Sequence, residues 1–267
     1  RDWSVTGVQT CALPISFFYT ARDPDQVLPA LYEIKADGSG ERFLLSNADE
    51  VAFDPVGEQF AFVRQVAEAP PAPAAEATEE AGVPISVPGG QFEIFSSYYS
   101  EPEAVIQLTN TGIASVHSPQ ISPDGRQMVF VSDFDGDEEL WIYDFASQTP
   151  TQITFNNAVD RDPRWSPDGR FIAFASDRET PGFLRIYVLN MDLDQFIIDE
   201  EGRAIPPATR LTSDQGSSYA PDWSPDGTQI AYINDRDGFG ALFVMLSDGQ
   251  RKRQLISGTT FEQRQPT

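Results

Sequence analysis

Short apolar runs alternate with polar turns along most of the chain. Four of these runs are equivalent to one another and lie at 60–63, 128–131, 171–175 and 229–233. Each is rich in β-branched or aromatic residues and is bounded by turn residues, which predicts a strand buried on both faces. After a polar turn, the last three are followed by another apolar strand, at 140–145, 184–189 and 241–246.

A five-residue motif precedes each of the four runs. It reads Trp-Ser-Pro-Asp-Gly at 165–169 and 223–227, Ile-Ser-Pro-Asp-Gly at 121–125, and, in a diverged copy, Phe-Asp-Pro-Val-Gly at 53–57. Proline presets φ, glycine accepts a positive φ, and the Ser and Asp side chains hydrogen-bond nearby backbone. The motif therefore predicts a tight reversal between two strands.

A hydrophobic residue followed by a hydroxyl residue marks the end of a fourth strand, at 107–109, 152–154, 210–212 and 254–257. The motif prolines are spaced by 68, 44 and 58 residues, so the two long intervals hold insertions of 24 and 14 residues. A period near 44 is typical of one four-stranded blade. The sequence thus predicts an all-β protein, a β-propeller of four-stranded antiparallel blades.

The whole repeat pattern is Pro-x-Trp-Ser-Pro-Asp-Gly, then Ile-Ala-Phe or Ile-Ala-Tyr, then Ser/Asn-Asp-Arg, then a strand and Leu-Thr. It closely resembles the repeats of TolB-like β-propellers from about Phe17 to the end of the chain. It is also similar to the propeller domains of the prolyl oligopeptidase family. The resemblance implies a protein of the periplasm or the cell exterior, but it is weak evidence for function, because functional sites are grafted onto folds.

Two parts of the chain are expected to lie outside the repeats. Residues 5–15 match the in-frame translation of a common sequencing adapter, so 1–16 are expected to be an artefact outside the fold. Residues 17–267 would form one propeller domain with a disordered Pro/Ala/Glu-rich insertion at about 66–90. A second insertion at about 192–207 has room for a short added strand at 196–198.

The two ends of the repeat array look incomplete. The innermost strand of the first unit is replaced by the adapter-like residues, and the chain stops one residue before a Trp is due. The sequence therefore predicts a truncated propeller, with four full blades and parts of two more.

The charge balance narrows the possible partners. The chain has 41 acidic and 18 basic residues and a formal net charge of −23. Such a surface repels phosphate backbones, so no nucleic-acid partner is expected. No run of 18 apolar residues occurs, so no transmembrane helix is predicted. Cys11, the one cysteine, lies in the adapter-like segment, which leaves the repeats without thiol chemistry.

Motifs for catalysis or cofactor binding are scarce. His117 is the single histidine, and neither a Gly-x-Ser-x-Gly elbow nor a phosphate-binding glycine loop occurs. No cofactor is therefore expected. The acidic run at 133–139 has the charge of a calcium loop, but its glycine is misplaced for an EF-hand. A solvated hairpin turn is the preferred interpretation, and calcium binding is the alternative.

The repeat offset predicts a candidate binding site. The first strand of each blade lines the channel, so the residues six places before the proline of the five-residue motif should ring one channel mouth, followed by a second ring one place later. The expected ligand-binding residues are Asp49, Glu50, His117, Arg161, Asp162, Tyr219 and Arg264. A polar ring of mixed charge suits a peptide or a small polar ligand. The alternative is a hydrated entrance without a ligand.

These observations favour a non-enzymatic scaffold that binds another protein, a peptide or a ligand outside the cytoplasm. The alternative is the propeller domain of a prolyl-oligopeptidase-like serine hydrolase whose catalytic domain is missing here. A third possibility, a lyase acting on acidic sugars, requires several histidines in the channel, and the single histidine argues against it.

Overall fold

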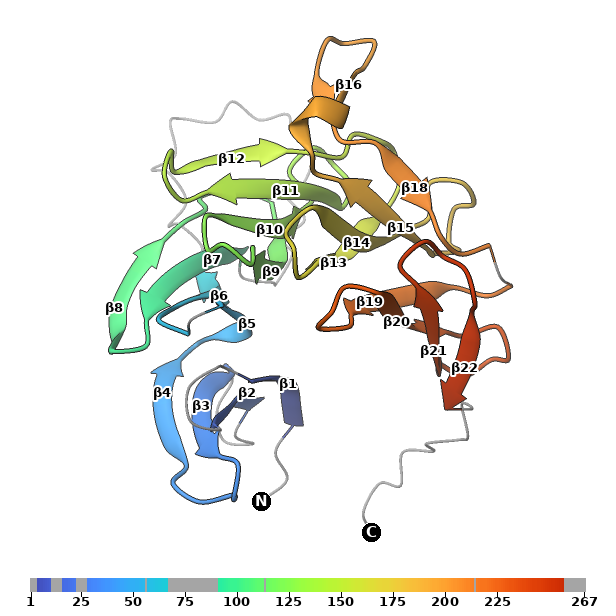
Figure 1. Ribbon diagram of the computed structural model, residues 1–267. Helices are drawn as coiled ribbons and strands as arrows, with labels where there is room; N and C mark the ends of the chain where they lie inside the picture. The colour runs from blue at the N-terminus through green and yellow to red at the C-terminus, as the bar shows by residue number, and fades with distance from the viewer. Residues whose placement is uncertain are drawn as a thin grey trace, which may run out of the picture.

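The computed structural model describes residues 4–10, 16–22, 28–55, 57–66, 91–112, 114–213 and 215–256. These residues form five four-stranded antiparallel sheets and one two-stranded hairpin. Figure 1 shows the sheets as successive blades around an arc, with the first strand of each blade toward the centre and the fourth outside. The prediction of an all-β propeller is confirmed.

Within each blade the strands pair in chain order. The first blade contains β1 (Ser4–Thr10), β2 (Ser16–Arg22), β3 (Ala30–Lys35) and β4 (Arg42–Ser46); the second contains β5 (Asp49–Phe53), β6 (Gln59–Val66), β7 (Gln91–Tyr98) and β8 (Glu101–Gln107). The third contains β9 (Val116–Ile121), β10 (Gln127–Ser132), β11 (Glu139–Asp144) and β12 (Thr149–Gln152). The fourth contains β13 (Asp160–Trp165), β14 (Phe171–Ser176), β15 (Arg185–Asn190) and β18 (Ala208–Arg210); the fifth contains β19 (Ser218–Trp223), β20 (Gln229–Asn234), β21 (Ala241–Leu246) and β22 (Arg253–Ile256).

The first blade has four strands in the structure, where the sequence predicted three. Residues 4–10 form β1 and pair antiparallel with β2, at the innermost position of the blade. A sheet edge offers unpaired backbone groups to any extended segment, whatever its side chains. The adapter origin of 1–16 stays a prediction, because it concerns where the sequence comes from. The predicted disorder of the first insertion falls almost wholly on 67–90, outside the described residues.

The hydrophobic core lies between blades. Four clusters of buried side chains each join two neighbouring blades, from the first and second to the fourth and fifth. The middle strands β10 and β14 are buried on both faces after their first residue, as predicted. In β20, however, buried and half-buried positions alternate, so this strand is buried on one face only. Among the described residues no further blade covers its other face.

The motif turn is held by its own side chains. In blade four, Ser166 Oγ accepts the N–H of Phe171 at 3.0 Å and donates to Asp168 Oδ1 at 2.5 Å. Gly169 has φ +70°, as the turn prediction requires. A Cβ built on Gly169 would lie 3.8 Å from Cδ of Pro123, in the motif of blade three. The turns of neighbouring blades therefore also touch one another.

Residues at two other repeated positions hold neighbouring blades and neighbouring strands together. Trp165 is buried in the cluster shared with blade three, so it packs on the preceding blade. In blades two to four, the hydroxyl after the fourth strand accepts a backbone N–H of the third strand. Thr154 Oγ1, for example, takes the N–H of Leu140 at 2.8 Å, and Thr212 Oγ1 that of Ile186 at 2.8 Å. The hydroxyl therefore pins the fourth strand to the third.

The second insertion, at 192–207, forms a small hairpin outside blade four. A 3₁₀ turn (Leu193–Gln195) leads into β16 (Ile197–Ile198), which pairs with β17 (Ala204–Ile205). The strand expected at 196–198 is therefore present. None of the helical segments in the described residues is long and apolar enough to cross a bilayer.

Candidate functional site at the channel mouth

A β-bulge near the start of the innermost strand recurs in blades two to five. One residue of each bulge has a positive φ: Glu50, Ser118, Asp162 and Ala220. None of these is glycine, so each blade stores backbone strain at the same place. Bulges re-aim side chains, and here they lie at the positions where the sequence placed the channel mouth.

Two of the predicted binding carboxylates tie neighbouring blades together. The Glu50 carboxylate accepts the backbone N–H of Ser118 in the next blade. Asp162 Oδ2 likewise accepts the N–H of Ala220 at 3.0 Å. Each bond joins bulges that are 68 or 58 residues apart in the chain. Glu50 and Asp162 therefore have a structural task that the sequence did not reveal.

His117 lies in an acidic setting. Its Nε2 is 3.6 Å from Glu138 Oε1, and its Nδ1 is 3.1 Å from Ser118 Oγ. Burial disfavours the charged imidazole, but the hydrogen bond to Glu138 and the charges of Glu50, Glu138 and Asp162 together raise the pKa of His117. The hydrogen bond to His117 lowers the pKa of Glu138 despite partial burial, and the charges of His117 and Arg161 add to that effect.

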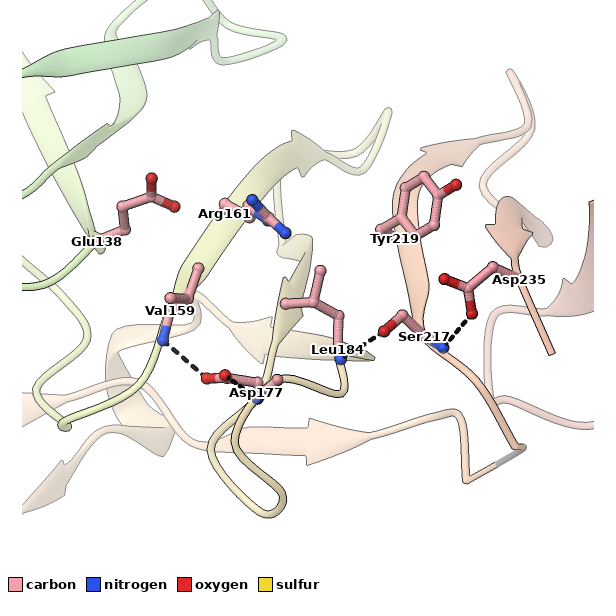
Figure 2. Close-up of a pocket in the computed structure, with 9 residues that line it drawn as sticks. Glu138, Val159, Arg161, Asp177, Leu184, Ser217, Tyr219 and Asp235 are labelled. Carbon is pink, nitrogen blue, oxygen red and sulfur yellow. Dashed lines mark hydrogen bonds between the residues drawn. The ribbon is translucent and has the colours of Figure 1, made fainter. Parts of the chain in front are cut away.

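A cavity of about 460 Å³ at this end of the propeller lies between blades four and five. Figure 2 shows the side chains of Arg161 and Tyr219 at its upper side, above Leu184. Within the described residues, no ion pair or side-chain hydrogen bond of Arg161 is formed. The Arg161 guanidinium is thus available to a ligand, although its charge also acts on the Glu138 carboxylate that lines the same cavity.

The cavity also contains two carboxylates that are already engaged. Asp177 accepts the N–H of Val159 at 2.9 Å and that of Gly182 at 2.7 Å. Asp235 Oδ1 accepts the N–H of Ser217 at 2.6 Å. These contacts fix the loop that enters each innermost strand (Figure 2).

Of the other predicted residues, three line a second cavity, and Asp162 lines neither of the two. Asp49, Glu50 and His117 line a pocket of about 260 Å³ between blades two and three. Asp49 Oδ1 accepts the hydroxyl of Thr20 at 3.3 Å. Arg264 lies outside the described residues. The described members of the ring therefore occupy one end of the propeller but do not converge on a single pocket.

Sequence reasoning missed Glu138 and the two aspartates of the larger cavity. A signal was present, because an Asp follows the second strand of three blades at 133, 177 and 235. Each of the three accepts a backbone N–H from the residue eighteen positions earlier. The sequence suggests a solvated turn residue at this position. In the structure, each Asp instead holds the start of the innermost strand through a hydrogen bond from a backbone N–H.

The acidic run at 133–139 turns its carboxylates toward separate partners. Asp133 Oδ1 accepts the N–H of Ser115 at 2.6 Å, and Asp135 Oδ2 accepts the side-chain amide of Gln152 at 2.6 Å. Glu138 faces His117. Over the part of the chain that the structure describes, no three His, Cys, Asp or Glu residues are grouped as metal ligands. This geometry favours the hairpin-turn interpretation.

Comparisons with known proteins agree with the fold and the repeats. Residues 101–197 match the family model described as TolB beta propeller domain. Over 169 residues the chain is 30% identical to a Protein TolB homolog of Chlorobium luteolum, an alignment that covers 63% of this chain and 35% of that protein. The chain thus spans about a third of the length of that relative.

Solved structures with low sequence identity share the fold. TolB from Acinetobacter baumannii superposes with a TM-score of 0.70 at 19% identity, over 96% of this chain and 55% of that one. Prolyl oligopeptidase B from Galerina marginata superposes with a TM-score of 0.59 at 10% identity, over 95% of this chain and 35% of that one. The protein is therefore a β-propeller. Its blades are TolB-like repeats.

Proposed function

We propose that this chain is a non-enzymatic binding scaffold that acts outside the cytoplasm and engages a protein or peptide at the channel mouth. The observation that carries the proposal is Arg161, which forms no ion pair or side-chain hydrogen bond among the described residues although it lines a cavity of about 460 Å³. Cavities that bind small ligands usually measure about 300–1,000 Å³. The location follows from the resemblance to TolB.

The charges around Arg161 define the group that it would bind. Asp177 and Asp235 are engaged by backbone N–H groups, and Glu138 faces His117. Arg161 is then free to form a paired hydrogen bond with one carboxylate, the geometry that guanidinium favours. The acidic rim would repel a ligand with many negative charges. We therefore expect a peptide with a single acidic side chain or a free C-terminus at this position.

The contacts of His117 also support a binding role over catalysis. Ser118, His117 and Glu138 are arranged like a serine, a histidine and an acid in a hydrolase. However, the N–H of Ser118, which would stabilise an oxyanion, is bound to the Glu50 carboxylate. A raised His117 pKa also favours the protonated imidazole, which cannot accept a proton as a general base. The proposal therefore assigns no catalytic residue.

Calorimetric titration with a panel of short peptides that end in a free carboxylate tests the channel-mouth site. Arg161→Ala should weaken binding of the best peptide by at least about tenfold, the loss expected for a charged hydrogen bond. Arg126→Ala is the matched control, because Arg126 is exposed on a motif turn, at the other end of its blade. Equal affinities of the parent and Arg161→Ala, or no binding by any peptide, would contradict the proposal.

A further inference from the structure

A second cavity lies at the opposite end of the innermost strands. It has a volume of about 560 Å³ and lies between the motif turns of blades four and five. Its floor includes Phe171, Val188 and Trp223, and its rim carries Asp168, Asp226 and Asp248. Arg161 and Trp165 occupy the two ends of one strand, four residues or about 13 Å apart. This groove is therefore separate from the channel mouth.

The groove departs from the repeat at one position. The first residue of the second strand is Gln59, Gln127 and Gln229 in blades two, three and five, but Phe171 in blade four. Phe171 stacks with Trp223 of blade five, with ring centroids 6.5 Å apart and planes inclined by 29°. The repeat pattern does not account for this half-buried aromatic pair, since the other blades fill the position with a polar side chain.

The aromatic floor is held in place before any ligand arrives. The indole N–H of Trp223 donates to the backbone carbonyl of Arg164 at 3.1 Å. The N–H of Phe171 donates to Ser166 Oγ at 3.0 Å. The Trp223 ring and the Phe171 backbone are therefore each held by a hydrogen bond to blade four. A preorganised apolar floor lowers the cost of ordering side chains on binding.

The rim of the groove carries carboxylates with oxygens that are not used in the turns. Asp168 and Asp226 each use Oδ1 for their own turn, accepting N–H groups of Arg170 at 3.1 Å and Thr228 at 3.0 Å. Hydrogen bonds to Ser224 and Thr228 lower the pKa of Asp226 to about 2, so it stays ionised. Within the described residues neither carboxylate forms an ion pair. A second oxygen on each is thus available to a cation.

An arginine of this chain already makes a cation–π contact with the aromatic floor of the groove. The guanidinium carbon of Arg170 lies 5.7 Å from the centroid of the Phe171 ring, within the range of a cation–π contact. Arg170 itself is more than half exposed and only loosely paired, at 3.9 Å from Asp192. An external arginine or lysine would have to replace Arg170 at this aromatic face, and it would find, in addition, the carboxylates of the rim.

We propose that this groove is a docking surface for a segment of a partner protein that presents Arg or Lys beside an apolar side chain. The apolar side chain packs on Phe171 and Trp223, and the cation reaches Asp168 and Asp226. The charge of −23 favours encounter with a basic partner over the whole surface. The groove is independent of the channel-mouth proposal, because the two sites share no residue.

A random heptapeptide library displayed on phage, selected on the 267-residue chain, tests the docking surface. Counter-selection uses Phe171→Gln, which restores the residue that three other blades tolerate. The expected peptides are enriched in Arg or Lys next to Leu or an aromatic residue. In calorimetry, the strongest peptide should bind at least about tenfold more weakly to Phe171→Gln and to the double variant Asp168→Asn/Asp226→Asn.

Asp124→Asn is the matched control, because it removes the equivalent charge from the motif turn of blade three, outside the groove. The asparagine variants keep an oxygen acceptor for the turn, and their thermal melting confirms folding. The proposal is overturned if the selected peptides are acidic or bind Phe171→Gln as well as the parent. It is also overturned if Asp124→Asn loses as much affinity as the double variant, or if the groove proves to bind a second copy of the chain.

Discussion

At the scale of single residues, the Ser-Pro-Asp-Gly motif performs two tasks, of which the sequence revealed one. The reversal and the positive φ of Gly169 and Gly227 were predictable, because Pro and Gly impose them locally. The contact of each glycine with the proline of the preceding blade was not, because it depends on how blades stack. Cβ atoms built at the two glycines would lie 3.8 and 3.7 Å from Pro123 and Pro167, an ordinary contact distance.

Because a Cβ at Gly169 would make only an ordinary contact, the effect of backbone strain can be distinguished there from the effect of steric crowding. Gly169→Val should destabilise the protein by about 1–3 kcal/mol through backbone strain, since φ is +70° and no close contact opposes a Cβ. Gly169→Asn should cost less, because asparagine tolerates positive φ. Urea unfolding of both variants measures the difference. Equal losses would mean that steric crowding, and not φ, decides the effect.

At the scale of elements, the sequence located most strands because apolar runs and turn residues bound them closely. β14 (Phe171–Ser176) begins at the predicted residue, β10 (Gln127–Ser132) begins one residue before it, and both are buried on both faces after the first residue. The bulges of the innermost strands and the one-sided burial of β20 were missed. Bulges follow from inter-blade hydrogen bonds such as that from Ala220 to Asp162, which no single repeat contains.

Trp165 tests the packing between blades. Trp165→Ala should lower stability by about 3–5 kcal/mol, as is typical when a buried tryptophan side chain is lost. Trp165→Phe should cost less, because the ring is kept and the indole N–H has no partner among the described residues. Denaturant midpoints report both values. An unchanged midpoint in Trp165→Ala would contradict the placement of this residue in the cluster with blade three.

At the scale of the whole molecule, the sequence predicted one ring of residues at the channel mouth, and the structure divides five of the described members between two pockets, with Asp162 in neither. The division arises because Glu50 and Asp162 bond to neighbouring blades, while Arg161 and Tyr219 face a cavity. Repeat offsets identify equivalent positions. They do not reveal which of the side chains at those positions are already engaged in contacts between blades.

The outer face of blade five exposes apolar side chains. Ala231, Ile233, Leu242 and Leu246 are half-exposed there, and exposed apolar patches promote association. The 267-residue chain should therefore self-associate in sedimentation velocity, and Ile233→Lys should weaken this association. Ile198→Lys is the control, since Ile198 is exposed on the hairpin of blade four. A compact monomer of the unmodified chain would contradict this prediction.

The pair formed by His117 and Glu138 makes the stability of the fold depend on pH. The raised pKa of His117 means that its contribution to stability is complete below its usual pKa and is lost as pH rises through the folded value. The lowered pKa of Glu138 means that its contribution is present above its usual pKa and is lost as pH falls. The pair therefore stabilises the fold most in mildly acidic solution.

The account depends most on the claim that the propeller gathers Glu50, His117, Glu138 and Asp162 at one channel mouth. NMR titration of His117 measures this directly, because it is the single histidine of the chain. We expect a pKa above the usual 6.5, falling in Glu138→Gln and unchanged in Glu179→Gln, whose side chain pairs with Arg210. A pKa at or below 6.5, insensitive to Glu138→Gln, would contradict the account.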